Sequence, residues 1–153
     1  MPDLFTHFVA ARAPGILVRD RRLVALLVIG TFLPDLVAKG LYWILLSGEA
    51  FPIATHSLLG VLLISYLACL FVDETLRPRG FAMLALGGFI HLLLDMIKDN
   101  LGSGAVRPFI PFTAFAFELR WIDPENVVLL IPIDAAVLAA LLLIERKLDR
   151  VRQ

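Results

Sequence analysis

The sequence predicts an all-α membrane protein, a polytopic bundle of about four transmembrane helices preceded by a short amphipathic or re-entrant helix. Of its 153 residues, 59% are hydrophobic, whereas soluble domains usually contain about 45–50%. The apolar residues gather in long runs that approach the roughly 20 residues needed to cross a bilayer. We therefore expect one membrane-embedded domain over residues 1–153, and the length of the runs argues against a soluble enzyme with a helical core.

Charge and cysteine content exclude several classes of function. The formal net charge is zero, so nothing suggests a nucleic-acid partner. The single cysteine, Cys69, lies in an apolar run, which excludes an intramolecular disulfide and a thiolate-rich metal site. Asp3 and His7 stand where a cleavable signal peptide would be basic and then apolar, so we expect no such signal.

The first expected element is an amphipathic helix over residues 3–12, where apolar residues recur at helical spacing. Pro14 and Gly15 are expected to end it. Residues 23–46 form the first apolar run, with Pro34 and Asp35 in its middle. Because proline disfavours helix at the preceding residue, we expect a kink or break near Leu33. Asp35 would then lie in the first turn of a second half-helix, where a carboxylate suits the positive end of the helix dipole.

Three further spans are expected, over residues 53–72, 80–99 and 126–144. The first of these begins with the sequence Thr-His-Ser, which contains His56. A polar loop at residues 73–79 precedes the next span. The long connection at 100–125 is rich in proline, glycine and aromatic residues; long loops are often functional, although aromatic residues also favour the membrane interface.

The distribution of lysine and arginine predicts that both termini lie on the inner side. Four spans place ten of the 14 basic residues on that side and four on or near the outer side. The inner ten are Arg12, Arg19, Arg21, Arg22, Arg77, Arg79, Arg146, Lys147, Arg150 and Arg152, and the outer four are Lys39, Lys98, Arg107 and Arg120.

His91 and Asp95 are the strongest functional candidates, because they are ionisable and lie in the apolar run at residues 80–99. A charged residue at bilayer depth costs roughly 2.5–3.5 kcal/mol on insertion scales, so such residues indicate function by default. Four residues apart, the two side chains share one helical face. An imidazole and a carboxylate placed in this way can bind a metal ion together.

Three other residues are expected to join this pair. The predicted topology places His56 and Asp35 at a depth similar to Asp95, towards the outer face. His7 can reach the same depth only if its helix folds back into the membrane. Imidazole and carboxylate ligands without thiolate suit Zn²⁺, Mn²⁺ or Fe²⁺. Five such groups allow two ions, or one ion with a bound water: His7, Asp35, His56, His91 and Asp95.

The structural alternative is that the carboxylates are neutralised by nearby lysines. Lys39 follows Asp35 by four residues and Lys98 follows Asp95 by three, so each pair can form locally. Asp134, in the last span, has no histidine beside it and is expected to make a hydrogen bond between helices.

The order of these motifs resembles the YdjM-like family of predicted inner-membrane metal-dependent hydrolases. The chain has an N-terminal histidine, then Leu-Pro-Asp, then Thr-His-Ser-Leu, then Gly-Gly-Phe-Ile-His-Leu-Leu-Leu-Asp, over about residues 3–118. This family is distantly grouped with zinc-dependent phospholipase C and P1 nuclease. Many relatives have a second aspartate where this chain has Val37, and a His-Arg pair before Thr-His-Ser where residues 51–54 are Phe-Pro-Ile-Ala. We therefore expect one metal ion, or two that share ligands.

The resemblance implies metal ligands at His7, Asp35, His56, His91 and Asp95, with zinc as the favoured ion. It also implies hydrolysis of a phosphoester, for which a membrane lipid headgroup is the substrate we favour. Asp99 and Glu118 are candidates for general acid or base. The alternative is a non-enzymatic membrane protein, either a metal or proton carrier or an interaction module.

Overall fold

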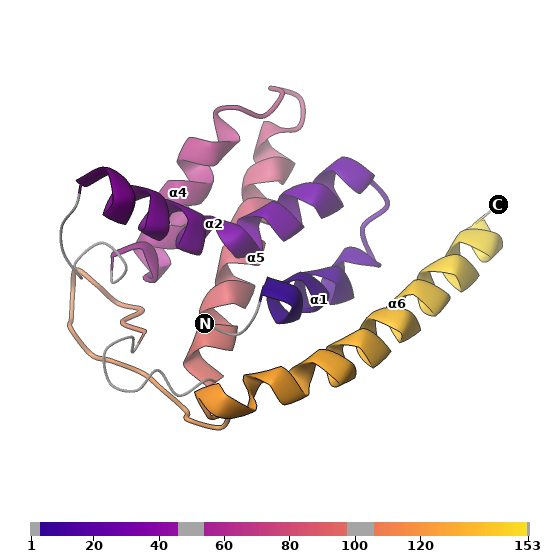
Figure 1. Cartoon of the computed structure of the whole chain (residues 1–153). Coiled ribbons are helices and arrows are strands. Elements are labelled where there is room, and N and C mark those ends of the chain that lie inside the picture. The colour runs from indigo at the N-terminus through magenta and orange to yellow at the C-terminus, as the bar shows by residue number, and fades with distance from the viewer. Residues whose placement is uncertain (1–3, 46–53, 98–105, 153) are drawn as a thin grey trace.

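The computed structural model describes residues 4–45, 54–97 and 106–152 of the chain. Over these residues the fold is helical, with one isolated antiparallel bridge between Val106 and Phe117, so the predicted all-α class is confirmed (Figure 1). The elements in order are α1 (Leu4–Gly15), α2 (Arg21–Leu45), α4 (Leu58–Cys69), α5 (Arg77–Ile97), the 3-10 helix η1 (Pro124–Leu129) and α6 (Leu130–Arg152).

Two of the described helices are long and apolar enough to cross a membrane, Arg21–Leu41 within α2 and Arg77–Ile97. Helix α4 has 12 residues and reaches only about 18 Å, which is less than the roughly 30 Å hydrocarbon core. Its outward side is nevertheless apolar, since Leu63 and Tyr66 are each 56% exposed. Contiguous exposed apolar surface of this kind is suited to contact with lipid. The number of spans stays a prediction.

Helices α2 and α5 form the centre of the fold and cross with their backbones in contact. A Cβ atom added to Gly30 would lie 2.2 Å from the carbonyl oxygen of Leu84, and one added to Gly87 would lie 2.2 Å from that of Leu27. No side chain fits at either position, so glycine is required for this approach. Small residues at helix crossings are typical of membrane bundles.

Helix α2 continues through Pro34, so of the kink or break predicted near Leu33 the break is absent. Asp35 consequently lies inside a long helix and not in the first turn of a new one. Proline removes one backbone donor, but in a membrane helix the neighbouring packing and side chains can compensate for the lost bond. Pro34 is fully buried, and the contact of α2 with α5 holds the two halves in one helix. Packing against α5 therefore keeps the helix continuous across the proline.

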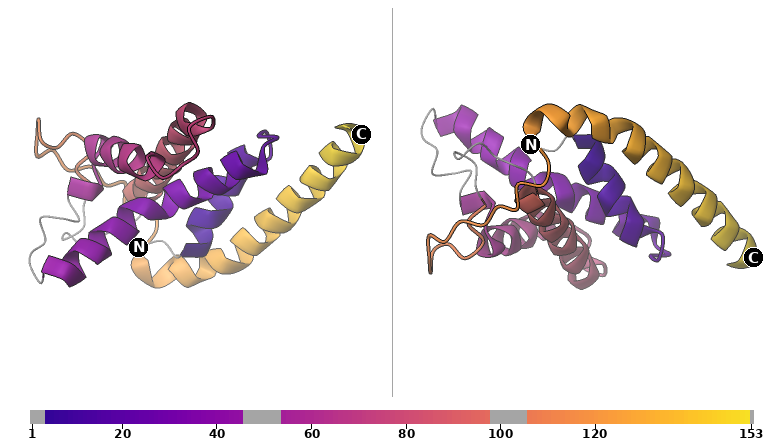
Figure 2. Two further views of the ribbon diagram at one scale, coloured as in Figure 1. Left: turned by 90° about the horizontal axis from the view of Figure 1, so that it is seen from above. Right: turned by 90° about the horizontal axis from the view of Figure 1, so that it is seen from below.

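Helix α1 lies between the α2–α5 pair and α6, as the views in Figures 1 and 2 show. Among the described elements, α6 contacts α1 and η1 alone. Two polar contacts join α1 to α6. The hydroxyl of Thr6 donates a hydrogen bond of 2.5 Å to Asp134, and Arg12 forms an ion pair with Glu145. The helix-to-helix hydrogen bond predicted for Asp134 is thus present.

The connection between α5 and η1 returns across the ends of α4 and α5. The amide of Leu58 donates to the carbonyl of Pro108 (2.9 Å), and the amide of Leu119 donates to that of Met96 (2.7 Å). Val106 is 2% exposed and packs with Val61 and Leu92 in an apolar cluster. This segment therefore covers the end of the bundle at which α5 carries Asp95.

Candidate metal centre

The glycine crossing of α2 and α5 brings their polar residues together. Asp35 follows Gly30 by five residues and His91 follows Gly87 by four, so both lie just beyond the point where the backbones touch. Their closest atoms, His91 Nε2 and Asp35 Oδ1, are 3.9 Å apart. On α5 itself, His91 Nε2 lies 3.2 Å from Asp95 Oδ2. The predicted pair on one helical face is therefore present, and α2 adds a second carboxylate.

His56 enters the centre from a helical turn that precedes α4. Ser57 caps α4, because its hydroxyl accepts a hydrogen bond from the amide of Gly60 (3.0 Å) and donates one to the carbonyl of Ala54 (2.8 Å). A serine at this position satisfies a backbone donor at the helix start. The cap fixes the turn just before the helix, and the ring of His56 consequently projects towards α2 and α5.

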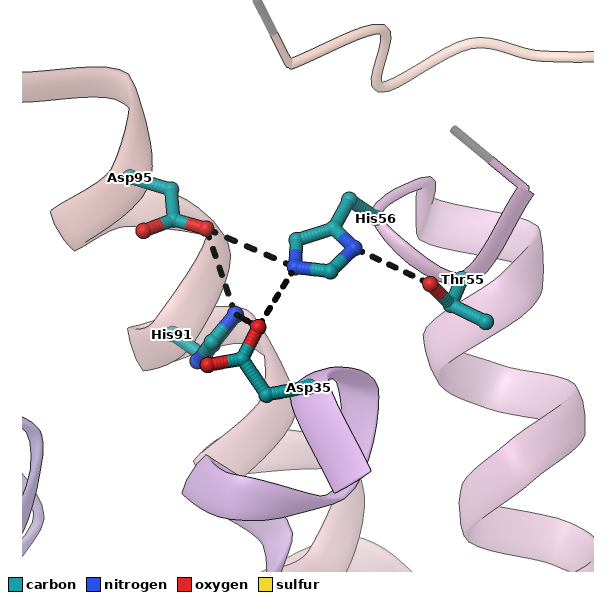
Figure 3. A network of polar contacts seen from close by, with 5 residues as sticks. All are labelled: Asp35, Thr55, His56, His91 and Asp95. Carbon is teal, nitrogen blue, oxygen red and sulfur yellow. Dashed lines mark hydrogen bonds and ion pairs between the residues drawn. The ribbon is translucent and has the colours of Figure 1, made fainter. Parts of the chain in front are cut away.

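The His56 ring lies between the two carboxylates (Figure 3). Its Nε2 atom is 3.3 Å from Asp35 Oδ1 and 3.5 Å from Asp95 Oδ2. The opposite ring nitrogen, Nδ1, lies 3.0 Å from the hydroxyl of Thr55. A partner on one ring nitrogen of a histidine fixes the tautomer and directs the other nitrogen to a metal. Thr55 therefore orients His56 with Nε2 towards Asp35 and Asp95.

His7 also reaches the centre, because α1 folds back against α2 and α5. Its side chain is 2% exposed, and its ring centroid lies 4.5 Å from that of His91 at an interplanar angle of 36°. His56 approaches His91 from another side, with the centroids 5.1 Å apart. The sequence left open whether His7 reaches the other candidate ligands, and in the structure it does.

The five predicted ligands form two groups that share His91. In each group, one potential ligand atom per residue lies within 4.8 Å of the others. The first group contains His7, His91 and Asp95, and the second contains Asp35, His56 and His91. This arrangement offers enough ligands for one ion with an open position, or for two neighbouring ions.

The environment of His91 fits a metal ligand. The side chain is 1% exposed, and neither ring nitrogen makes a hydrogen bond to any residue in the described ranges. Its Nε2 atom instead faces the carboxylates of Asp95 and Asp35, at 3.2 and 3.9 Å, and a metal ion between these nitrogen and oxygen atoms would use all three as ligands. With neutral histidines, Asp35 and Asp95 together carry two negative charges, which a divalent cation would balance. These donors are nitrogen and oxygen atoms, which suit zinc, manganese or iron.

The lysine alternative takes a weaker form at Asp35: the charge of Lys39 acts on this carboxylate, but the two groups form no ion pair in the described part of the chain. Lys39 is exposed, whereas Nε2 of His56 and Nε2 of His91 lie 3.3 and 3.9 Å from the carboxylate of Asp35. The corresponding partner predicted for Asp95, Lys98, lies outside the described residues. Cys69 does not contribute, since its thiol donates to the carbonyl of Arg77.

Of the two weaker candidates for proton transfer, Asp99 and Glu118, the structure describes one. Asp99 lies outside the described residues. Glu118 is described, and its carboxylate lies 3.0 Å from Nε of Arg120. The backbone of the next residue, Leu119, bonds to Met96 beside Asp95, so Glu118 is carried by the segment that covers the site. Its role in proton transfer stays a prediction.

Sequence reasoning did not find the residues that position the ligands. Thr55 belongs to the Thr-His-Ser motif, but its hydrogen bond to the adjacent histidine ring depends on a turn that spacing does not reveal. Gly30 and Gly87 are two of the 10 glycines in the sequence, and only the helix crossing distinguishes them from the other glycines.

Fold and site together define a helical membrane protein with a buried cluster of three histidines and two aspartates. A family comparison agrees with this class: the model for YdjM inner membrane proteins matches residues 1–147, and the chain belongs to that family. No curated protein and no solved structure matches the chain.

Proposed function

We propose that this protein is a membrane-bound, metal-dependent hydrolase that acts on a phosphoester. The observation that carries the proposal is the convergence of four potential ligands on a fifth, His91, which is buried without a hydrogen bond in the described structure. Buried ionisable groups in a membrane protein are expensive and usually functional. Family membership supports the membrane location, since the family is one of inner membrane proteins.

Zinc is the ion we favour, with manganese or iron as alternatives, and one or two ions are bound. A divalent ion supplies Lewis-acid polarisation of a phosphoryl oxygen and activation of a water for attack. The protein's own residues prepare this site. Thr55 holds the ring of His56 by Nδ1, and Val106 packs on Leu92, the residue that follows His91. Glu118, or Asp99, would transfer a proton.

A lipid headgroup is the substrate we favour, and phosphoester chemistry is what the sequence resemblance implies through a distant grouping with zinc-dependent phospholipase C and P1 nuclease. In the proposed topology, four helices span the membrane with both termini inside, and the site opens towards the outer side. The segment that covers the site exposes large aromatic side chains, among them Phe112 at 87% and Trp121 at 74%. Aromatic residues favour the interface, where a lipid can enter laterally.

Hydrolysis is tested with the metal-loaded protein in mixed micelles of detergent and phospholipid. We expect cleavage of the phosphoester by water, with release of a phosphorylated headgroup and diacylglycerol. Turnover should be lost in His91→Ala and retained in Leu4→Ala, since Leu4 is 61% exposed. Metal binding without turnover on any phosphoester would instead favour the non-enzymatic alternative, a metal or proton carrier or an interaction protein.

A further inference from the structure

A cavity of about 910 Å³ lies among α1, α2 and α6, and none of the five candidate metal ligands lines it. Helix α1, the connection that follows it, the N-terminal half of α2 and the C-terminal half of α6 all contribute to its wall. Its polar wall contains Arg12, Arg19, Arg21 and Glu145. Figures 1 and 2 show the α1–α2 connection and α6 on one side of the molecule. The cavity plays no part in the function proposed above.

The cavity carries unbalanced positive charge. Arg12 is neutralised by its ion pair with Glu145 across the cavity. Arg19 and Arg21 are exposed, and neither makes an ion pair within the described ranges. Two guanidinium groups therefore remain available at the end of the cavity formed by the α1–α2 connection. Guanidinium groups bind phosphate oxygens with paired hydrogen bonds.

The rest of the wall is apolar. Val24 and Val28 contribute from successive turns of α2, and Leu142 contributes from α6. This apolar surface begins one turn beyond Arg21 and continues along the helix into the candidate membrane span Arg21–Leu41. A ligand that uses the whole cavity therefore has an anionic head and an apolar tail.

The arginine end is separate from the metal centre. Arg21 precedes Asp35 by 14 residues in one continuous helix, which corresponds to roughly 21 Å along its axis. An anion held by Arg21 therefore does not reach the histidine cluster.

We propose that this cavity binds an anionic phospholipid, with its phosphate on Arg19 and Arg21 and an acyl chain along Val24, Val28 and Leu142. Charge complementarity selects this occupant. A zwitterionic lipid such as phosphatidylcholine brings its own cation with its phosphate and would leave the net positive charge of the two guanidinium groups unbalanced, and a free phosphate would leave the apolar wall empty. A basic cluster that only sets membrane topology would need no cavity, and Arg22 would serve it as well as Arg21.

The test measures lipids retained by detergent-purified protein, using native mass spectrometry with phosphatidylglycerol and phosphatidylcholine of identical acyl chains. The wild type should retain phosphatidylglycerol in preference to phosphatidylcholine. Arg19→Gln/Arg21→Gln removes the charge-assisted hydrogen bonds of both guanidinium groups to the phosphate and should therefore weaken retention at least about tenfold. The matched control, Arg22→Gln/Arg79→Gln, removes the same charge from two exposed arginines outside the cavity wall and should keep the preference.

A second variant tests the role of the cavity's volume independently of its charge. Ala25 lines the cavity and is exposed, so Ala25→Trp fills the space while all arginines remain. It should lose retention of phosphatidylglycerol. Equal loss in both arginine pairs, or full retention in Ala25→Trp, would overturn the proposal. Metal content should match the wild type in every variant, because the two sites are distinct; this readout also reports that the variants are folded.

Discussion

The imidazole ring of His7 packs against that of His91, with their centroids 4.5 Å apart. This contact joins the first helix of the chain to the buried face of α5, across more than half of the sequence. It makes α1 part of the candidate metal centre and not a peripheral segment. The same helix is held on its far side by α6, through Thr6 and Arg12.

His7→Ala should weaken metal binding without unfolding the protein. The substitution removes one ligand from the group His7, His91 and Asp95, while the group around Asp35 and His56 keeps all its members. We expect the affinity to fall by about tenfold or more, equivalent to ~1.4 kcal/mol. Competition with a chelating dye would measure it. Leu4→Ala on the exposed side of the same helix is the control, and an unchanged affinity in His7→Ala would remove His7 from the ligand set.

Gly87→Ala should disturb both stability and metal binding. The added methyl group would lie 2.2 Å from the carbonyl oxygen of Leu27, so α2 and α5 must move apart. Overpacking of this kind typically costs about 1–3 kcal/mol. Thermal unfolding in detergent would report the loss, together with metal content.

Gly40→Ala is the matched control for that prediction. Nothing lies within 4 Å of a Cβ added at Gly40, and alanine favours helix over glycine by about 0.8–1.0 kcal/mol. This variant should be as stable as the wild type or more so. Equal effects at Gly87 and Gly40 would argue against a tight glycine crossing.

Thr55→Val should lower metal affinity by about 10–100-fold, the usual effect of losing a residue that orients a metal ligand. Valine keeps the shape of threonine but cannot bond to Nδ1 of His56, which the Thr55 hydroxyl approaches to 3.0 Å. Thr55→Ser keeps the hydroxyl and should restore most of the affinity. If serine and valine behave alike, Thr55 serves packing and not orientation.

Thr6→Val and Asp134→Asn together test how α6 is attached to α1. The Thr6 hydroxyl donates to the Asp134 carboxylate, and a double-mutant cycle on unfolding free energy should give a coupling of about 0.6 kcal/mol, the mean for such bonds in a membrane protein. A coupling of zero would mean that the hydrogen bond does not stabilise the pair.

Local sequence patterns predicted the parts of the site that depend on local geometry. The spacing of His91 and Asp95 places both on one face of a helix, and the structure has them 3.2 Å apart. A kink or break was predicted near Leu33, and the break is absent because the contact of α2 with α5 keeps the helix continuous across Pro34. That contact depends on residues more than 50 positions apart.

The approach of His7 to His91 is also non-local. It requires the turn between α1 and α2 and the support of α6, which spacing within one segment does not encode. The Thr55 hydrogen bond needs a turn geometry that follows from the Ser57 cap. Ligand identity was therefore accessible from residue type and resemblance, while ligand positioning required the three-dimensional structure.

Metal content, measured by mass spectrometry on detergent-purified protein, tests the central claim most directly. The wild type should carry about one or two equivalents of a transition metal, and His91→Ala should carry none. Lys39→Ala is the control, because Lys39 is exposed and one turn from Asp35; it should keep the metal. Absence of metal from wild-type protein, even after reconstitution, or full retention by His91→Ala, would contradict a metal centre at this site.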